Sequence, residues 1–145
     1  MTKRLTGIIS ALLIMCLFVV PLSPVSAAEG VTPRYNNVAT VTANMGISDS
    51  GKMTINYKYT GSSSVTTKAV ITTYIEKKFL GLFWRRVDIG TTDDQWVDTI
   101  YDYMYVGTRN HQLSSSGTYR VTIIYKIYGS GGAADEIECQ MTDSY

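Results

Sequence analysis

The sequence predicts an all-β protein, a two-layer antiparallel β-sandwich of about seven strands. Beyond residue 38, apolar and polar residues alternate in segments that are rich in Thr, Val, Ile and Tyr. Clusters of Gly, Ser, Asp and Asn interrupt these segments roughly every 8 to 15 residues, as turns do in all-β proteins. No segment there repeats apolar residues at helical spacing over about three turns. A small closed barrel is the alternative arrangement of the same strands.

Residues 1–27 have the layout of a secretory signal peptide. Lys3 and Arg4 precede an apolar run of about 16 residues, and small residues ending at Ala27 follow that run. An uncleaved membrane anchor is the alternative, but an anchor requires about 20 apolar residues. We therefore expect the signal to be removed and the protein to be secreted or extracellular, where it can remain associated with the cell surface.

The first three strands follow a polar lead-in at residues 28–37. Alternate apolar residues predict a strand at 38–47, which ends at a Ser-Asp-Ser-Gly turn. A second strand at 52–59 alternates Met, Ile and Tyr with Thr, Asn and Lys, and a Gly-Ser-Ser-Ser turn ends it. A third strand at 65–79 places Ala, Ile, Thr and Ile on one face.

The remaining strands continue the pattern to the end of a single domain, residues 38–145. A Gly turn precedes the fourth strand, a Thr-Thr-Asp-Asp turn precedes the fifth, and a Gly-rich turn separates the last two. The clearest alternation is in the sixth strand, with Tyr, Val, Ile, Tyr and Ile on one face. We expect these strands at 84–92, 96–106, 118–128 and 135–142, with a polar connection at 107–117.

Charge and cysteine content narrow the function classes. Without Lys3 and Arg4, the chain keeps 11 of its 13 basic residues and all 12 acidic ones, so its net charge is −1. This charge gives no reason to expect nucleic-acid binding. Only Cys139 remains, which excludes a disulfide within the domain. Cys139 shares a strand face with Ile137 and Met141, which predicts a buried thiol that packs as a small apolar side chain. Spacings typical of zinc, dinucleotide or nucleotide sites do not occur, so no cofactor or metal is expected.

Residues 113–121 resemble the tyrosine corner of immunoglobulin-like and fibronectin-type sandwiches. In those domains a Tyr near the start of the penultimate strand bonds back to the preceding loop. The resemblance implies an immunoglobulin-like sandwich in which Tyr119 is the corner, Val121 replaces the core cysteine and Leu113 anchors the loop. The Cys…Trp…Cys set of true immunoglobulin domains is missing from the sequence.

A wider resemblance covers nearly the whole domain. A signal peptide, a Ser-x-Ser-Gly turn, a basic hairpin from Glu76 to Val87 and a Gly-x-Tyr-x-Val segment follow one another in the chain. This order resembles small secreted immunoglobulin-like or fibronectin-type β-sandwich proteins of Gram-positive bacteria. Those proteins have no assigned activity, so the resemblance implies a location outside the cell rather than a reaction.

An unusual segment joins the third and fourth strands, where five large apolar residues are flanked by four cations. The hairpin tip consists of Phe79, Leu80, Leu82, Phe83 and Trp84, and the cationic collar of Lys77, Lys78, Arg85 and Arg86. If exposed, such a cluster marks a site that binds a partner protein. It would equally suit an anionic membrane, where aromatic residues reach the headgroups and cations meet phosphates. Alternatively, the tip folds back over an open end of the sandwich as core.

A second candidate site is an aromatic row. Tyr101, Tyr103 and Tyr105 alternate within the expected fifth strand, which places them on one face. Tyr rings bury apolar area and their hydroxyls form hydrogen bonds, which suits contact with carbohydrate or protein. A cross-strand aromatic ladder on a solvated sheet face is the structural alternative.

An acidic run follows the fourth strand. Asp93, Asp94 and Asp98 offer carboxylate oxygens of the kind that calcium prefers. The run lacks the alternating Asp-x-Asp-x-Asp-Gly pattern of a calcium loop, so we interpret it as a solvated turn rather than a metal site.

The sequence therefore favours a secreted, non-enzymatic binding module whose partner is a protein or another component of the cell envelope. A peripheral membrane protein that inserts the hairpin tip is the alternative. A small hydrolase that uses His111 with the nearby serines is a weaker one, because a general base requires a nucleophile and an orienting group beside it.

Overall fold

The computed structural model describes residues 35–145, and within them every regular element is a β-strand. The all-β prediction is therefore confirmed for this part of the chain. The expected signal peptide at 1–27 and most of the lead-in lie outside the described residues. The strands are β1 Thr40–Ile47, β2 Lys52–Thr60, β3 Thr66–Phe79, β4 Phe83–Arg86, β5 Trp96–Ile100, β6 Met104–Gln112, β7 Thr118–Gly129 and β8 Asp135–Ser144.

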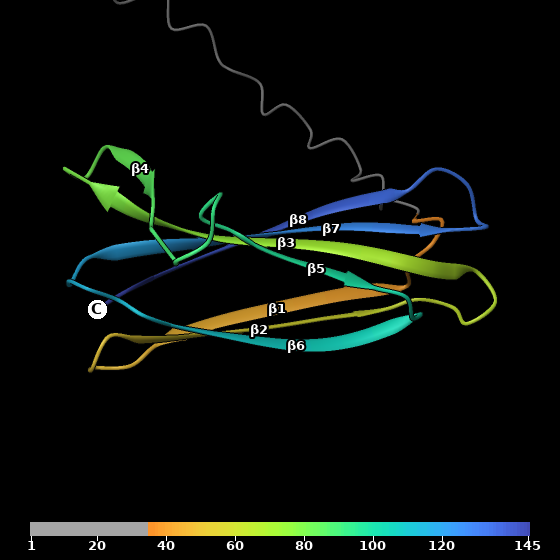
Figure 1. Ribbon diagram of the computed structural model, residues 1–145, viewed down its shortest axis with the longest axis horizontal. Coiled ribbons are helices and arrows are strands. Elements are labelled where there is room, and N and C mark those ends of the chain that lie inside the picture. The colour runs from red at the N-terminus through yellow and green to blue at the C-terminus, as the bar shows by residue number, and fades with distance from the viewer. Residues whose placement is uncertain (1–34) are drawn as a thin grey trace, which may run out of the picture. The chain divides into compact units, whose positions relative to one another are not determined.

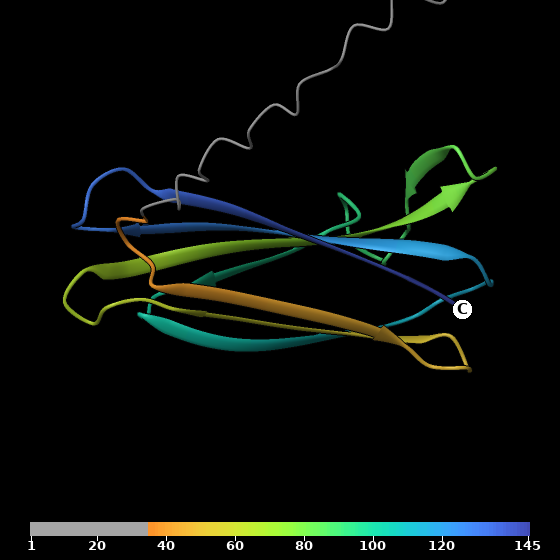
Figure 2. The same ribbon diagram turned by 180° about the vertical axis from the view of Figure 1, so that it is seen from behind.

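The strands form two antiparallel sheets. One sheet has the order β1-β2-β6, and the other has the order β4-β3-β7-β8 with β5 beside β3. Figures 1 and 2 show the two sheets as stacked layers, with the β3–β4 hairpin rising from one end. Because the strands pair by backbone ladders only within each of these two sheets, the arrangement is a sandwich rather than a closed barrel.

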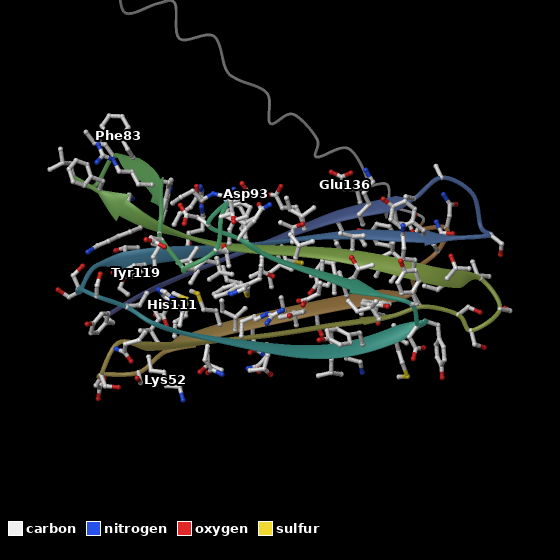
Figure 3. All side chains as sticks on the ribbon, in the orientation of Figure 1. Lys52, Phe83, Asp93, His111, Tyr119 and Glu136 are labelled. Atoms are coloured by element: carbon white, nitrogen blue, oxygen red, sulfur yellow. The ribbon has the colours of Figure 1, made fainter. Side chains whose placement is uncertain are left out.

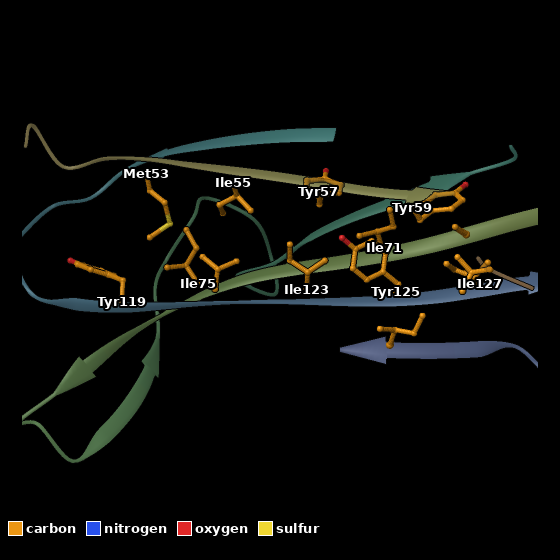
Figure 4. Packing of buried hydrophobic residues seen from close by; sticks show 14 of the residues in the cluster. Met53, Ile55, Tyr57, Tyr59, Ile71, Ile75, Tyr119, Ile123, Tyr125 and Ile127 are labelled. Carbon is orange, nitrogen blue, oxygen red and sulfur yellow. The ribbon is translucent and has the colours of Figure 1, made fainter. Parts of the chain in front are cut away.

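The core lies between the two sheets and follows the predicted alternation. In β2, β3 and β7 every second side chain points inward, and Figure 4 shows those side chains meeting between the layers. Burial of each large apolar side chain contributes about 1.5–3 kcal/mol. The fully buried residues include Met53, Ile55, Tyr57, Tyr59, Ala69, Ile71, Ile75, Tyr119, Val121, Ile123, Tyr125 and Ile127.

Two buried tyrosines connect the sheets through their hydroxyl groups. Tyr57 of β2 donates to the Oδ2 atom of Asp98 on β5, at 2.6 Å. Tyr125 of β7 donates in the opposite direction, to the backbone carbonyl of Thr42 on β1, at 3.1 Å. An unpaired buried hydroxyl costs about 1–3 kcal/mol, so these bonds hold the two layers in one relative position.

The tyrosine corner geometry is present. The Tyr119 hydroxyl donates to the carbonyl oxygen of Ser115, four residues earlier in the connection between β6 and β7. Leu113, expected as the apolar anchor of that connection, is buried, and so is Val121 on the core face of β7. These contacts fix the path of the chain from the first sheet to the second.

Part of the polar lead-in is built into the sandwich. The carboxylate of Asp135, at the start of β8, accepts backbone hydrogen bonds from Asn36, Asn37 and Val38 at 2.6–3.0 Å. Asn37 is buried and its side chain donates to the carbonyl of Ala133 at 2.7 Å. The lead-in is thereby attached to the β7–β8 hairpin before β1 begins.

The predicted fifth strand, 96–106, is wrong, as is the polar connection at 107–117. The chain leaves one sheet at the end of β5, crosses at residues 101–103, and enters the other sheet as β6. Three hydrogen bonds of 2.6–2.7 Å hold this crossing. The Tyr59 hydroxyl donates to the carbonyl of Asp102, and the amide of Tyr103 donates to the Asp102 carboxylate. The amide of Gly61 donates to the carbonyl of Tyr103. The sequence signal failed because polar residues continue the β6 ladder.

The fourth strand is shorter than the predicted 84–92 and ends at Arg86. Beyond it, the Asp88 carboxylate accepts a hydrogen bond of 2.8 Å from the amide of Gly90, whose φ of +80° turns the chain away from the sheet. Val87 and Ile89 nevertheless pack against the core from this irregular segment.

The buried tyrosines predict a loss of stability in alkaline solution. Burial, reinforced by the carboxylate of Asp102, raises the pKa of Tyr59 from 10.0 to about 12. The unfolded chain therefore releases this proton at lower pH than the folded one, so stability is complete below pH 10 and falls as the pH rises towards 12. The expected slope is at most about 1.4 kcal/mol per pH unit for each such tyrosine. Urea unfolding at pH 8, 10 and 11.5 measures it.

A Tyr59→Phe variant provides the control for this pH dependence. It loses the hydrogen bond to the Asp102 carbonyl and should be about 1 kcal/mol less stable than the wild type at pH 8. Above pH 10, however, its stability should fall less steeply, because one titrating group is gone. Equal slopes for the two proteins would contradict this assignment.

Candidate functional site

The β3–β4 hairpin ends in a tight turn with an unusual backbone. The amide of Leu82 donates to the carbonyl of Phe79 at 3.0 Å, and Leu80 and Gly81 have φ values of +51° and +70°. Gly81 adopts this left-handed conformation without steric cost. For Leu80 the same conformation costs roughly 1–2 kcal/mol. The hairpin therefore holds a leucine at its apex against the intrinsic preference of the backbone.

The hairpin tip is exposed. Leu80 and Leu82 are 76% and 73% exposed, and Phe83 and Phe79 are 59% and 42% exposed. Figure 3 shows Phe83 on the hairpin, at a distance from the labelled Tyr119 and His111 nearer the sheets. The alternative that the tip folds back as core is therefore wrong, because β3 carries these residues past the end of the core.

Trp84 differs from the rest of the hairpin tip because it is partly buried between two cations. Lys78, its neighbour across the ladder, has its Nζ atom 5.7 Å from the Trp84 ring centroid, and the Arg120 guanidinium lies 4.4 Å from it. Arg120, on β7, donates two hydrogen bonds of 2.6 and 2.9 Å to Glu76. Arg120 could not be assigned to the hairpin from the sequence, because only the β3–β7 register brings it there.

The cationic collar divides between the two faces of the hairpin. Lys77 lies directly opposite Arg85, whereas Arg86 lies opposite Glu76. Side chains that are directly opposite in an antiparallel ladder share a face, and like charges in that position repel. The Arg85 guanidinium stacks 4.0 Å from the Phe79 ring centroid, and the Lys77 ammonium donates to Ser115 Oγ at 2.6 Å.

A pocket of about 360 Å³ lies at the base of the hairpin. A volume of this size falls within the range of small-molecule sites, about 300–1,000 Å³. Its walls come from the hairpin, the segment after β4, the end of β6 and the tyrosine corner. The lining residues are Lys77, Phe79, Arg85, Arg86, Val87, Asp88, His111, Gln112, Ser114 and Tyr119.

The pocket contains two residues of the hydrolase alternative, His111 and Ser114, and also a carboxylate that this alternative did not include, that of Asp88. His111, Ser114 and Asp88 all line it, but no hydrogen bond joins them within residues 35–145. The His111 ring instead packs edge-on against Trp96, with 6.3 Å between centroids. Burial lowers the pKa of His111, and the carboxylate of Asp88 opposes that shift. The imidazole is therefore neutral at pH 7, without an activated serine beside it.

The aromatic row is not a row on one strand. Tyr101 and Tyr103 lie in the crossing between the sheets, and Tyr105 lies on β6. Tyr101 is 80% exposed, whereas Tyr105 is half-buried, with its ring centroid 6.2 Å from that of Tyr57. The prediction is wrong because it required a continuous strand through residues that connect two sheets.

The acidic run does not gather into one site. The Asp98 carboxylate turns towards the core, where it accepts from Tyr57 and pairs with Arg109 of β6. Asp93 and Asp94 lie in the turn before β5. Among residues 35–145, no group of three or more His, Cys, Asp or Glu side chains is arranged to hold a metal ion.

Cys139 occupies the core-facing side of β8, opposite Ile123 on β7. Its thiol is partly buried rather than fully buried. Burial raises its pKa, and the neighbouring carboxylate of Glu138 adds to the shift. The thiol therefore stays protonated at neutral pH and packs as a small apolar side chain.

Comparisons with known proteins give no family. No family model matches the chain, and no curated protein matches it. Among solved structures, a crystal structure of a protein assigned as ApaA from Bordetella pertussis aligns at 16% identity and a TM-score of 0.36, covering 76% of this chain and 95% of that one. In the part of the chain that the structure describes, no helix is long and apolar enough to span a membrane.

The strained apex predicts that a polar substitution will stabilise the protein. Leu80→Asn should raise the free energy of unfolding by about 0.5–1 kcal/mol, because Asn tolerates a positive φ and the Leu80 side chain is already exposed. Leu82→Asn is the matched control: it removes a similarly exposed leucine without a positive φ and should give no gain. Urea unfolding compares them, and equal effects would contradict the strain.

Proposed function

We propose that the protein is a secreted, non-enzymatic binding module that contacts a component of the cell envelope through its hairpin tip. The observation that carries this proposal is the exposure of four large apolar side chains at the end of one hairpin. Contiguous exposed apolar residues of this kind mark interaction sites in proteins that otherwise bury such residues.

The proposed fold type is an immunoglobulin-like sandwich. β1, β2 and β6 would take the places of strands A, B and E, and β3, β7 and β8 those of strands C, F and G. The Tyr119 hydrogen bond lies where the tyrosine corner of that fold lies, at the start of the penultimate strand. The pairing of β5 with β3 departs from constant-type domains, in which strand D pairs with strand E.

The hairpin offers a preformed contact surface. Cation stacking on Phe79 and Trp84 restricts the side chains at its base, and each such contact contributes about 0.5–2 kcal/mol. An ordered surface loses less conformational entropy on binding than a disordered one. The strained backbone at Leu80 does not bring its side chain into the core of the sandwich, because that side chain is exposed. Backbone strain of this kind is concentrated at functional sites.

Export from the cell would place this surface beside the envelope. The proposal of secretion rests on the residues of the first 27 positions, with their basic start, apolar run and small residues before Ala27. The proposed partners are therefore a protein or another envelope component.

A double substitution tests the contact site. Leu82→Ser with Phe83→Ser should reduce retention of the purified protein on isolated cell-envelope fractions by about tenfold or more, because two anchors of about 1.5 kcal/mol each are lost. Val97→Ser with Val106→Ser is the matched control, because these valines are 53% and 69% exposed on β5 and β6. Equal retention of the tip variant and the wild type would remove the site assignment.

Direct membrane contact is a second candidate function, favoured by one observation. The apolar side chains lie at the apex, and the cations Lys77 and Arg85 lie behind them along the ladder. In an interfacial protein this order would place the apolar side chains at the acyl boundary and the cations at the phosphates.

Sedimentation with vesicles distinguishes the two functions. A membrane-binding protein should pellet with phosphatidylglycerol vesicles, release as salt rises, and bind phosphatidylcholine vesicles poorly. The Leu82→Ser, Phe83→Ser variant should stay in the supernatant. If the wild type pellets with neither vesicle, membrane contact is excluded and the envelope partner is a macromolecule.

A further inference from the structure

The pocket at the base of the hairpin has an excess of positive charge. Three cations line it, Lys77, Arg85 and Arg86, against a single carboxylate, that of Asp88. Within residues 35–145, no acidic side chain lies within ion-pair distance of Lys77 or Arg85. The surroundings of the pocket therefore leave roughly two positive charges without compensation.

The two cations nearest the ladder also repel each other. Lys77 and Arg85 are direct cross-strand partners, and both line the pocket. A like-charge pair in this position destabilises an antiparallel ladder. Sequences break such local rules mainly at functional or strained sites. An anion bound between Lys77 and Arg85 would relieve the repulsion.

Neighbouring side chains hold both cations in place, and N–H donors of both remain available to a ligand. The Arg85 guanidinium stacks on Phe79, and no hydrogen bond joins its nitrogens to another side chain of the described residues. A stacked guanidinium keeps its N–H donors in the plane of the group, where they match an oxyanion. Lys77 is positioned by Ser115 and by the Tyr119 ring, 5.4 Å from its Nζ atom.

We propose that this pocket binds a phosphate group between Lys77 and Arg85, with an apolar part of the same ligand against Phe79 and Val87. A phosphate monoester carries a charge of about −1.5 to −2, which matches the excess charge of the lining. The apolar side chains beside the cations would bury a hydrocarbon portion. This site goes beyond the proposed tip contact, because it shares only Phe79 with the hairpin tip and does not use the apical Leu80, Leu82 and Phe83.

Calorimetric titration of the purified wild-type protein tests the site with two probes. Inorganic phosphate and n-hexyl phosphate are titrated at constant ionic strength, with chloride as the background anion. Saturable binding of either probe is the expected result. Tighter binding of hexyl phosphate is expected from the apolar lining, whereas equal affinities would overturn the apolar part of the proposal and leave a site for the phosphate group alone.

Variants assign the binding to the pocket. Lys77→Gln and Arg85→Gln should each weaken binding about tenfold or more, because each removes a charge-assisted hydrogen bond. Lys68→Gln is the matched control, since Lys68 is also on β3, stacks on a tyrosine ring at 4.4 Å and has no acidic partner among the described residues. It should bind phosphate as the wild type does.

Three results would overturn the proposal: no saturable binding to the wild type, unchanged binding in Lys77→Gln and Arg85→Gln, or an equal loss in Lys68→Gln. Urea unfolding of each variant separates loss of binding from loss of folding. Each substitution relieves the repulsion between Lys77 and Arg85 but also removes a stabilising contact, the Lys77–Ser115 hydrogen bond or the stacking of Arg85 on Phe79. The Leu82→Ser, Phe83→Ser variant should retain phosphate binding, so the pocket and the tip contact can fail separately.

Discussion

Hydrogen bonds from buried tyrosines hold the two sheets of this domain in a fixed relation. Each ring fills the core, and each hydroxyl needs a partner that the apolar interior does not supply. Tyr57 finds it in Asp98 and Tyr125 in the carbonyl of Thr42, each on the opposite sheet. Because Asp98 also pairs with Arg109, the same contact closes the open side between β5 and β6. The described residues hold one free cysteine, so packing and these bonds carry the stability that a disulfide supplies elsewhere.

The exposed hairpin follows from the length of β3. This strand has 14 residues, and its buried face ends at Ile75, so the last residues extend beyond the core. There the rings of Phe79 and Trp84 are covered by cations instead of by the opposite sheet. The same stacking that orders the hairpin leaves its apex in solvent, which is why an apolar tip and a cationic base occur together.

The hairpin contains two local conflicts between sequence and structure. Leu80 adopts a backbone conformation that suits glycine, and Lys77 faces Arg85 across the ladder. In β7, by contrast, propensity, alternation and burial agree, because every inward side chain is buried from Tyr119 to Ile127. Two such conflicts in one hairpin direct attention to it as a place where function, rather than folding, selected the residues.

By itself the sequence determined the all-β class, most strands and their inward faces, because alternation of period two is a local property of the chain. It did not separate β5 from β6. The inward positions of β6 hold Gly107, Arg109 and His111, and Gly107 is required because a Cβ atom there would lie 2.5 Å from the Tyr57 ring. Nor did it place Arg120 on Trp84 or reveal the pocket. Only the tertiary structure decided these features and the exposure of the tip, because they depend on contacts between residues far apart in the chain.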